Sequence, residues 1–252
     1  MRNQFVILAA GKGTRMNNEQ VPKVLTMLKA KPLILYLLEE IEKVGQLIKP
    51  VVVVGYMHKQ VEAVLGDGFL YALQEQQLGT AHAVLAARKK VKAENILVLY
   101  GDMPFIQADS LKELINMHFK TGSKISMLTA QVESYGGIYE SLEHYGRIIR
   151  EPIEHNIVGI VEFKDASPEQ RQIKEVNPGI YMFNAGWLWN NLDKIQNHNA
   201  QAEYYLTDIA KVAIEQGEKI HSLMINPKEV LGVNSRQDLA VAEEVLAENI
   251  SG

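Results

Sequence analysis

Leu8-Ala-Ala-Gly-Lys-Gly-Thr-Arg-Met16, followed after five residues by Pro22-Lys23, is the stretch that decides the fold of this chain. The apolar run Gln4–Leu8 predicts a strand, and two glycines follow it directly. Glycine lacks a Cβ, so the backbone can approach a ligand closely and adopt positive φ. Successive N–H groups in such a turn form a concavity that binds anions, and Arg15 and Lys23 add two cations. The segment therefore predicts a loop suited to a triphosphate.

Two familiar phosphate-binding patterns do not fit this loop. A P-loop requires Gly-x-x-x-x-Gly-Lys-Ser/Thr, and neither Gly11 nor Gly13 opens that spacing. A dinucleotide-binding fingerprint requires a third glycine where Met16 stands, which argues against a dehydrogenase. An ordinary turn between a strand and a helix is the remaining alternative, and the length of the string disfavours it.

The composition excludes several classes of protein. The 252 residues are 47% hydrophobic and 22% charged, which is enough for one large α/β domain with a sizeable core. The net charge of −4 does not favour nucleic-acid binding, and the lack of cysteine excludes disulfides and cysteine-ligated zinc. The N-terminal apolar run is too short for a secretory signal, and no apolar stretch is long enough to span a membrane. We expect a cytoplasmic protein with neither nucleic acid nor a membrane as partner.

Strands and helices alternate along the chain. The β-branched run Val51–Val54 is typical of a buried parallel strand, and Pro32–Val44 has the apolar periodicity of a helix that stops at Gly45. In the first half we also expect strands at 69–73, 96–100 and 124–130, and helices at 59–65, 80–91 and 110–120. In the second half we expect antiparallel strands at 145–151 and 157–163, a strand at 180–183, and helices at 204–216 and 235–248. The pattern predicts an α/β fold, with a Rossmann-like mixed, mostly parallel sheet, helices on both faces and an inserted antiparallel lobe.

Two polar motifs follow strands of the predicted sheet. Gln74-Glu-Gln-Gln-Leu-Gly79-Thr80 follows the third strand. A glutamine amide both donates and accepts, so it can read the edge of a pyrimidine, and Thr80 can cap the next helix. Tyr100-Gly101-Asp102 ends the fourth strand, where a carboxylate projects into the crevice at the carboxyl ends of the strands. A turn aspartate that bonds only its own backbone is the alternative for Asp102.

Together these motifs resemble the signature of the sugar-phosphate nucleotidyltransferases, and within that family the uridylyltransferases that make UDP-N-acetylglucosamine. The resemblance extends from about Phe5 to about Leu246. It implies a GT-A-like nucleotidyltransferase fold, UTP and a sugar-1-phosphate as substrates, and Mg²⁺ as cofactor. It also implies catalytic roles for Arg15, Lys23 and Asp102, and metal ligation by Asp102 and Asn234.

The resemblance assigns further residues to the two substrates. For the nucleotide it implies Leu8, Ala9, Ala10, Gly11, Gly13, Thr14, Lys23, Gln74, Gly79, Thr80, Tyr100 and Gly101. For the acceptor sugar it implies Gly146, Glu162 and Asn177. Without the resemblance, Glu162 would be interpreted as a solvated carboxylate at a strand end, and Asn234 as a helix N-cap. The segment 203–208 also matches the family, and we expect it to brace the acceptor part.

Four features depart from the family pattern. His144 and Pro178 stand where the family usually has Gly and Thr, the loop 133–143 is long, and the gap between Met16 and Pro22 has one extra residue. All but the last surround the acceptor, so they leave the nucleotide site largely intact and leave open another sugar-1-phosphate as substrate. Another nucleoside triphosphate is a further alternative. A non-catalytic UDP-sugar-binding protein is disfavoured, because Lys23 and Asp102 are both present.

We expect a single nucleotidyltransferase domain over residues 1–252. Its nucleotide-binding part is predicted at about 1–130, its acceptor part at about 131–234 and a C-terminal helix at 235–250. No six-residue repeat is present, so we expect no hexapeptide-repeat acetyltransferase domain. No two histidines have the i, i+4 spacing of a helical metal site. The sequence leaves the oligomeric state open.

Overall fold

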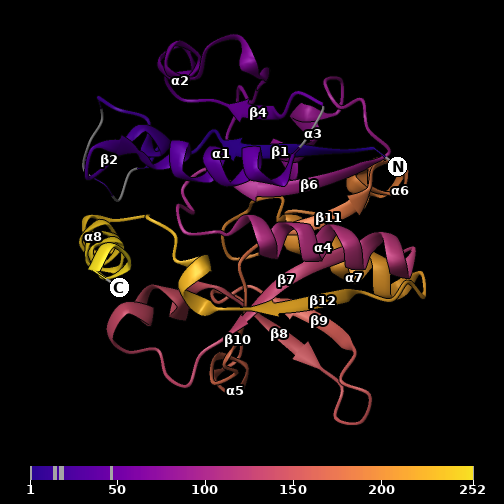
Figure 1. The fold of residues 1–252 in the computed structure, drawn as a ribbon. Coiled ribbons are helices and arrows are strands. Elements are labelled where there is room, and N and C mark those ends of the chain that lie inside the picture. Colours follow the sequence, from indigo (N-terminus) through magenta and orange to yellow (C-terminus); the bar gives the residue numbers. More distant parts are fainter. Residues whose placement is uncertain (1, 14–15, 17–19, 46–47, 252) are drawn as a thin grey trace.

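A mixed β-sheet runs through the computed structural model, which describes residues 2–13, 16, 20–45 and 48–251. The order is β5-β4-β1-β6-β11-β7-β10-β8-β9, with β12 paired to β7 (Figure 1). The strands are β1 (Asn3–Ala9), β4 (Val51–Val54), β5 (Leu70–Leu73), β6 (Asn95–Tyr100), β7 (Ile125–Gln131), β8 (Gly146–Arg150), β9 (Ile157–Val161), β10 (Glu175–Asn177), β11 (Tyr181–Asn184) and β12 (His221–Ile225). The helices are α1 (Leu33–Val44), α2 (His58–Leu65), α3 (Thr80–Ala87), α4 (Ala108–Thr121), α5 (Pro168–Arg171), α6 (Ala185–Asn191), α7 (Ile209–Glu215) and α8 (Arg236–Ser251).

Strand β1 lies inside the parallel half of the sheet. It pairs with β4 on one side and β6 on the other, and Leu8 lies opposite both Val53 and Tyr100. Beyond β6, strand β11 runs antiparallel to β6 and β7, and β10, β8 and β9 continue the sheet with antiparallel pairings. The prediction of a mixed sheet that carries an antiparallel lobe is therefore confirmed.

Alternate residues of β1 enter two different cores, because successive side chains of a strand point to opposite faces. Val6 and Leu8 pack with residues of α3, α6 and α7. Phe5 and Ile7 pack with residues of α1 and α4. Figure 1 shows α1 and α4 lying across one face of the sheet. Helices thus cover both faces, as predicted, and the parallel strands are buried on each side.

The long periodic elements match the prediction, and several short ones do not. Helix α1 ends at Val44, and Gly45 adopts φ 79° after it. The helix expected at 80–91 ends at Ala87, and the one expected at 204–216 divides into the 3-10 helix Leu206–Asp208 and α7. Elements that the sequence did not predict are β10, β12, α6 and the hairpin of β2 (Met27–Leu28) with β3 (Lys31–Pro32).

Helix α8 lies beside β2, at the end of the sheet where β1 and β6 finish (Figure 1). Its Ala242 and Val245 pack in a third core with Leu28 and Leu142. This placement brings the segment before α8 to the carboxyl ends of the parallel strands, where a ligand is predicted from the sequence. No helix among the described residues is long and apolar enough to cross a membrane.

His118 of α4 is buried beneath the sheet and is 2% exposed. Its Nδ1 lies 2.9 Å from Oγ of Ser126, and its Nε2 lies 3.3 Å from Oδ1 of Asn95. Burial, and to a lesser degree the neighbouring His221, lowers the pKa of His118 from 6.5 to about 4. The unfolded chain therefore takes up a proton before the folded protein does, and the stability that His118 contributes falls as the pH drops from 6.5 toward 4.

We expect the free energy of unfolding to be lower at pH 5 than at pH 7.5, with about 2 kcal/mol of the loss due to His118. His118→Gln should remove that part of the pH dependence, whereas replacement of the exposed His198 by Gln should retain it. Urea unfolding of the three proteins at both pH values measures the difference. An unchanged pH dependence in His118→Gln would contradict the assignment.

Candidate functional site

Two cavities share one wall at the carboxyl ends of β1 and β6. The first, here called the loop cavity, has a volume of about 350 Å³ and is bounded by the glycine loop after β1. The second, here called the lobe cavity, has a volume of about 310 Å³ and is bounded by the antiparallel lobe. Residues that line both are Lys23, Thr80, Tyr100, Asp102 and Glu203.

The structure brings most of the sequence-predicted residues to these cavities. Those at the loop cavity are Leu8, Ala9, Ala10, Gly11, Lys23, Gln74, Gly79, Thr80, Tyr100 and Asp102. Those at the lobe cavity include Gly146, Glu162, Asn177 and Asn234. Gly13 and Gly101 do not line either cavity. Thr14 and Arg15, like most of the gap between Met16 and Pro22, lie outside the described residues.

The glycine loop packs directly against the stem of Lys23. Gly13 adopts φ 65°, and a Cβ built on it would lie 2.8 Å from Cβ of Lys23. Gly11 does not adopt positive φ, and a Cβ there would meet nothing within 4 Å. Pro22 precedes the 3-10 helix Lys23–Leu25, which fixes the backbone of the lysine. The predicted turn is therefore formed at Gly13, whereas Gly11 is left facing open space.

The ammonium of Lys23 lies between Asp102 and Asn234. Its Nζ donates to Oδ2 of Asp102, and it donates to Oδ1 of Asn234 over 2.9 Å. The side chains of Lys23 and Asp102 are only 17% and 8% exposed. The backbone N–H of Val233 donates to the carbonyl of Asp102 over 2.9 Å, which holds the loop before α8 against the end of β6.

The side chain of Asn234 does not cap α8, so the alternative reading as an N-cap is wrong. Asp238 Oδ2 accepts from the backbone N–H groups of Asn234 and Ser235 over 2.9 and 2.8 Å. Ser235 Oγ in turn accepts from the N–H of Asp238 over 3.1 Å, which completes a capping box. Because Ser235 and Asp238 satisfy the helix start, the amide oxygen of Asn234 is directed to the cavities instead.

The donor set of Asp102 and Asn234 fits a magnesium ion. Both residues direct a hard oxygen at one point, which the lysine ammonium occupies. Mg²⁺ prefers one or two such oxygens and completes its shell with waters and substrate phosphates. Within the part of the chain that the structure describes, no group of three or more His, Cys, Asp or Glu is placed to hold a metal ion.

The loop after β5 is braced by the segment 203–208. Gln74 is 4% exposed, and its Nε2 donates to the carbonyl of Gly79 over 3.1 Å. Gly79 adopts φ 115° and ψ 177°, and a Cβ built on it would lie 2.5 Å from the carbonyl oxygen of Tyr204. Only glycine tolerates both this backbone conformation and this approach. The shape of the polar loop therefore depends on its contact with Tyr204.

Thr80 does not cap α3, contrary to the prediction. The N-cap is Gly79, and no side chain bonds the helix start. Thr80 Oγ1 instead accepts from the backbone N–H of Leu206 over 2.9 Å. The segment 203–208 therefore braces the loop of the first half of the chain, and Glu203, Tyr205 and Thr207 also line the lobe cavity. Glu203 and Tyr205 lie before the 3-10 helix Leu206–Asp208, where Tyr205 is extended, so the predicted helix over 204–216 does not begin there.

Glu162 lies at the wall of the lobe cavity. Thr207 Oγ1 donates to its Oε1. Burial raises the pKa of Glu162, the nearby charges of Asp208 and Asp165 raise it further, and the bond from Thr207 opposes the rise. The carboxylate is thus held in one orientation by Thr207, which is unlike the solvated strand-end carboxylate of the alternative reading.

The residues that depart from the family pattern also lie at the lobe cavity. Asn177 Oδ1 accepts from the N–H of Gly179 over 2.9 Å, so its side chain spans Pro178, which has no N–H to donate. His144 packs edge-on against Phe163, with 5.3 Å between ring centroids. A Cβ on Gly146 would lie 3.5 Å from Glu162 Oε2, which makes glycine the residue that leaves most room there.

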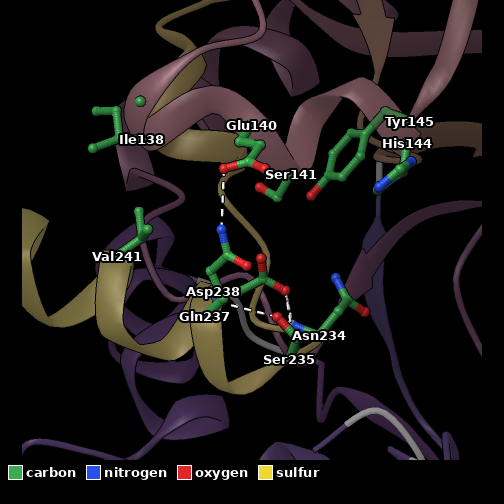
Figure 2. Close-up of a pocket in the computed structure, with 11 residues that line it drawn as sticks. Ile138, Glu140, Ser141, His144, Tyr145, Asn234, Ser235, Gln237, Asp238 and Val241 are labelled. Atoms are coloured by element: carbon green, nitrogen blue, oxygen red, sulfur yellow. Dashed lines mark hydrogen bonds between the residues drawn. The ribbon is translucent and has the colours of Figure 1, made fainter.

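A third cavity, of about 330 Å³, lies between the 3-10 helix Gly137–His144 and the start of α8. Figure 2 shows the residues that line it. Gln237 Nε2 donates to Glu140 Oε2 over 3.0 Å and joins the two elements. His144, Tyr145 and Asn234 line both this cavity and the lobe cavity. The long loop 133–143 therefore forms part of the wall of this cavity and contacts α8.

Comparison with known proteins assigns the chain to a family. The model of the MobA-like NTP transferase domain matches residues 5–169. The chain is 43% identical over 249 residues to the bifunctional protein GlmU of Caldicellulosiruptor saccharolyticus, covering 97% of this chain and 52% of that protein. It is 40% identical over 247 residues to the GlmU of Caldanaerobacter subterraneus, covering 98% of this chain and 52% of that protein. The chain thus spans about half the length of the curated relatives it matches.

Two solved structures share the fold at lower sequence identity. UDP-glucose pyrophosphorylase complexed with UDP-glucose superposes with a TM-score of 0.76 at 20% identity, over 99% of this chain and 100% of that one. A glucose-1-phosphate thymidylyltransferase from Bacillus anthracis, described as putative, gives a TM-score of 0.77 at 19% identity, over 96% and 94% of the two chains. At this identity the likeness concerns the fold alone.

We expect Gly79→Ala to lower the free energy of unfolding by at least about 2 kcal/mol, because alanine is strained at this φ and its Cβ would meet Tyr204. Gly11→Ala is the matched control in the same cavity, and should leave the stability unchanged because nothing lies within 4 Å of the added carbon. Chemical unfolding monitored by circular dichroism compares the two. Equal stability of both variants would contradict the role given to the contact with Tyr204.

Proposed function

The chain belongs to the family of MobA-like NTP transferase domains, and we propose that it transfers the uridylyl group of UTP to N-acetylglucosamine-1-phosphate. The products are UDP-N-acetylglucosamine and pyrophosphate. The observation that carries the proposal is the wall of Lys23 and Asp102 shared by two cavities, because a reaction between two phosphates needs both held at one point. The similarity to proteins named GlmU, over nearly the whole of this chain, supports the choice of substrates.

The reaction proceeds in one displacement at phosphorus. An oxygen of the sugar phosphate attacks the α-phosphorus of UTP, and the bond from that phosphorus to the oxygen bridging the α- and β-phosphates breaks. Pyrophosphate leaves with the electron pair, so no covalent intermediate with the protein is required. The protein then contributes positioning and stabilisation of the charge that develops.

Lys23 is the central residue of this mechanism. It lines both cavities, so its ammonium can neutralise the α-phosphate of the nucleotide and the phosphate of the acceptor. The backbone around Gly11 would hold the β- and γ-phosphates, and we assign Arg15 to the same phosphates from the sequence. Asp102 and Asn234 would hold Mg²⁺, which when bound lowers the mutual repulsion of the phosphates.

Residues of the loop cavity would select the base of the nucleotide. Because Nε2 of Gln74 is engaged with Gly79, its Oε1 is the atom to accept from the N–H of uracil. Glu162 and Asn177 would bond the acceptor sugar from the lobe cavity, with Gly146 leaving room for the N-acetyl group. His144 and Pro178 line the same cavity, so another sugar-1-phosphate is the second candidate acceptor.

We expect pyrophosphate release from UTP and Mg²⁺ to be faster with N-acetylglucosamine-1-phosphate than with glucose-1-phosphate, by about tenfold or more in kcat/KM, because a site built to bond a polar group disfavours an analogue that lacks it. Glu162→Ala should raise the KM for the sugar phosphate and spare that for UTP. Initial rates with both acceptors at matched UTP give the comparison. Equal rates would overturn the acceptor assignment, and no release with any sugar phosphate would overturn the proposed function.

We expect Lys23→Ala to lower kcat/KM by something like 10²–10³-fold, the range found when one donor to a developing anion is removed. Arginine should rescue poorly, since the two cations differ in shape and hydration. Lys43→Ala is the control, because that lysine is exposed on α1 and pairs with Glu40. An alanine variant of Lys23 within a few-fold of the unmodified protein would remove this residue from the chemistry.

A further inference from the structure

Lys23 occupies the point at which the oxygens of Asp102 and Asn234 converge. It donates to both, and the side chains of Lys23 and Asp102 are largely buried. Hydrogen bonds in which the donor or the acceptor is ionised are about twice as strong as those between neutral groups. The same two oxygens are the ones assigned to the divalent metal. The ammonium of Lys23 and the metal ion therefore compete for one site.

We propose that Lys23 is an internal cation that keeps Asp102 and Asn234 paired while no nucleotide is bound, and that the triphosphate draws it away as the divalent ion enters. The proposal rests on the proposed function, because the exchange requires a polyphosphate ligand. Mg²⁺ sits about 2.1 Å from its oxygen ligands, which leaves no space for an ammonium at the same point. The metal ion therefore binds only when the lysine has moved.

The loop cavity offers the ammonium a second position. The stem of Lys23 lies against Gly13, and its backbone is fixed by bonds from the N–H of Thr26 to the carbonyl of Lys23 and from the N–H of Leu25 to that of Pro22. Lysine has a flexible stem of four carbons. Rotation of that stem alone carries the charge toward the anion-binding loop, with no change in the fold.

The exchange couples metal and nucleotide. Leaving Asp102 without a cation is costly because it is largely buried, and the ammonium removes this cost in the free protein. A metal ion that arrives alone must displace the ammonium without a phosphate to receive it. Because the coupling is reciprocal, nucleotide tightens the binding of metal as much as metal tightens the binding of nucleotide.

The test measures Mn²⁺ binding to the whole chain by calorimetry and electron paramagnetic resonance without nucleotide. Lys23→Met keeps the stem and removes the charge, and should bind Mn²⁺ about tenfold or more tightly than the unmodified protein. Lys23→Gln is a second variant with the same expectation. Lys12→Met is the matched control, since Lys12 lines the loop cavity and is exposed, and it should leave the affinity unchanged.

Two further results locate the effect. Lys23→Met combined with Asp102→Asn should lose the gained affinity, and thermal unfolding should show that each variant is folded. Equal Mn²⁺ affinity of the unmodified protein and both folded Lys23 variants would overturn the exchange. This readout needs no turnover, so an overturned exchange with normal formation of UDP-sugar leaves the proposed function standing. A gain in Mn²⁺ affinity with no reaction of any sugar phosphate would support the exchange and overturn the proposed function.

Discussion

The parallel pairing of β1 with both β4 and β6 is the constraint on which the rest of the structure depends. Because Leu8 lies level with Tyr100, the glycine loop and Asp102 leave the sheet at the same height. The backbone bond from Val233 to Asp102 then attaches a segment from the far end of the chain to that point. A shift of β1 by one residue would exchange its two apolar faces and also separate the loop from the carboxylate.

The second half of the chain builds its cavity on this frame rather than beside it. Strand β11 inserts antiparallel between β6 and β7, with Tyr181 opposite Val98. The turn at Pro178 therefore emerges next to the end of β6, and the lobe shares Tyr100 and Asp102 with the loop cavity. The two cavities adjoin here because one sheet runs through both halves of the chain.

The sequence predicted the elements whose signals are local. The strand at Val51–Val54 and helix α1 appear with nearly the expected bounds, since β-branched runs, apolar periodicity and a glycine stop act over a few residues. The positions of the glycine loop and Asp102 at the ends of parallel strands were predicted for the same reason. The short β10 and β12 were missed because they are specified by partners far away in the chain.

The errors within the site have a similar cause. Thr80 is a residue type that often caps helices. Its hydroxyl oxygen instead accepts from the N–H of Leu206, which is far away in the chain. The role of Asn234 could not be decided from the sequence, because only the folded structure shows that Ser235 and Asp238 cap α8 in its place. The pairing of Lys23 with Asp102 and Asn234 could not be predicted from the sequence, because it joins residues that meet only in the folded chain.

The three residues Lys23, Asp102 and Asn234 are made at different times during synthesis of the chain. The first two residues are 79 positions apart, and Lys23 and Asn234 are 211 apart. A ribosome makes the chain from its N-terminus at about 5–20 residues per second, so the lysine and the aspartate are available many seconds before the asparagine. The contact between the lysine and the aspartate therefore does not depend on later parts of the chain having been made, whereas the third member is added only once the segment before α8 has been made.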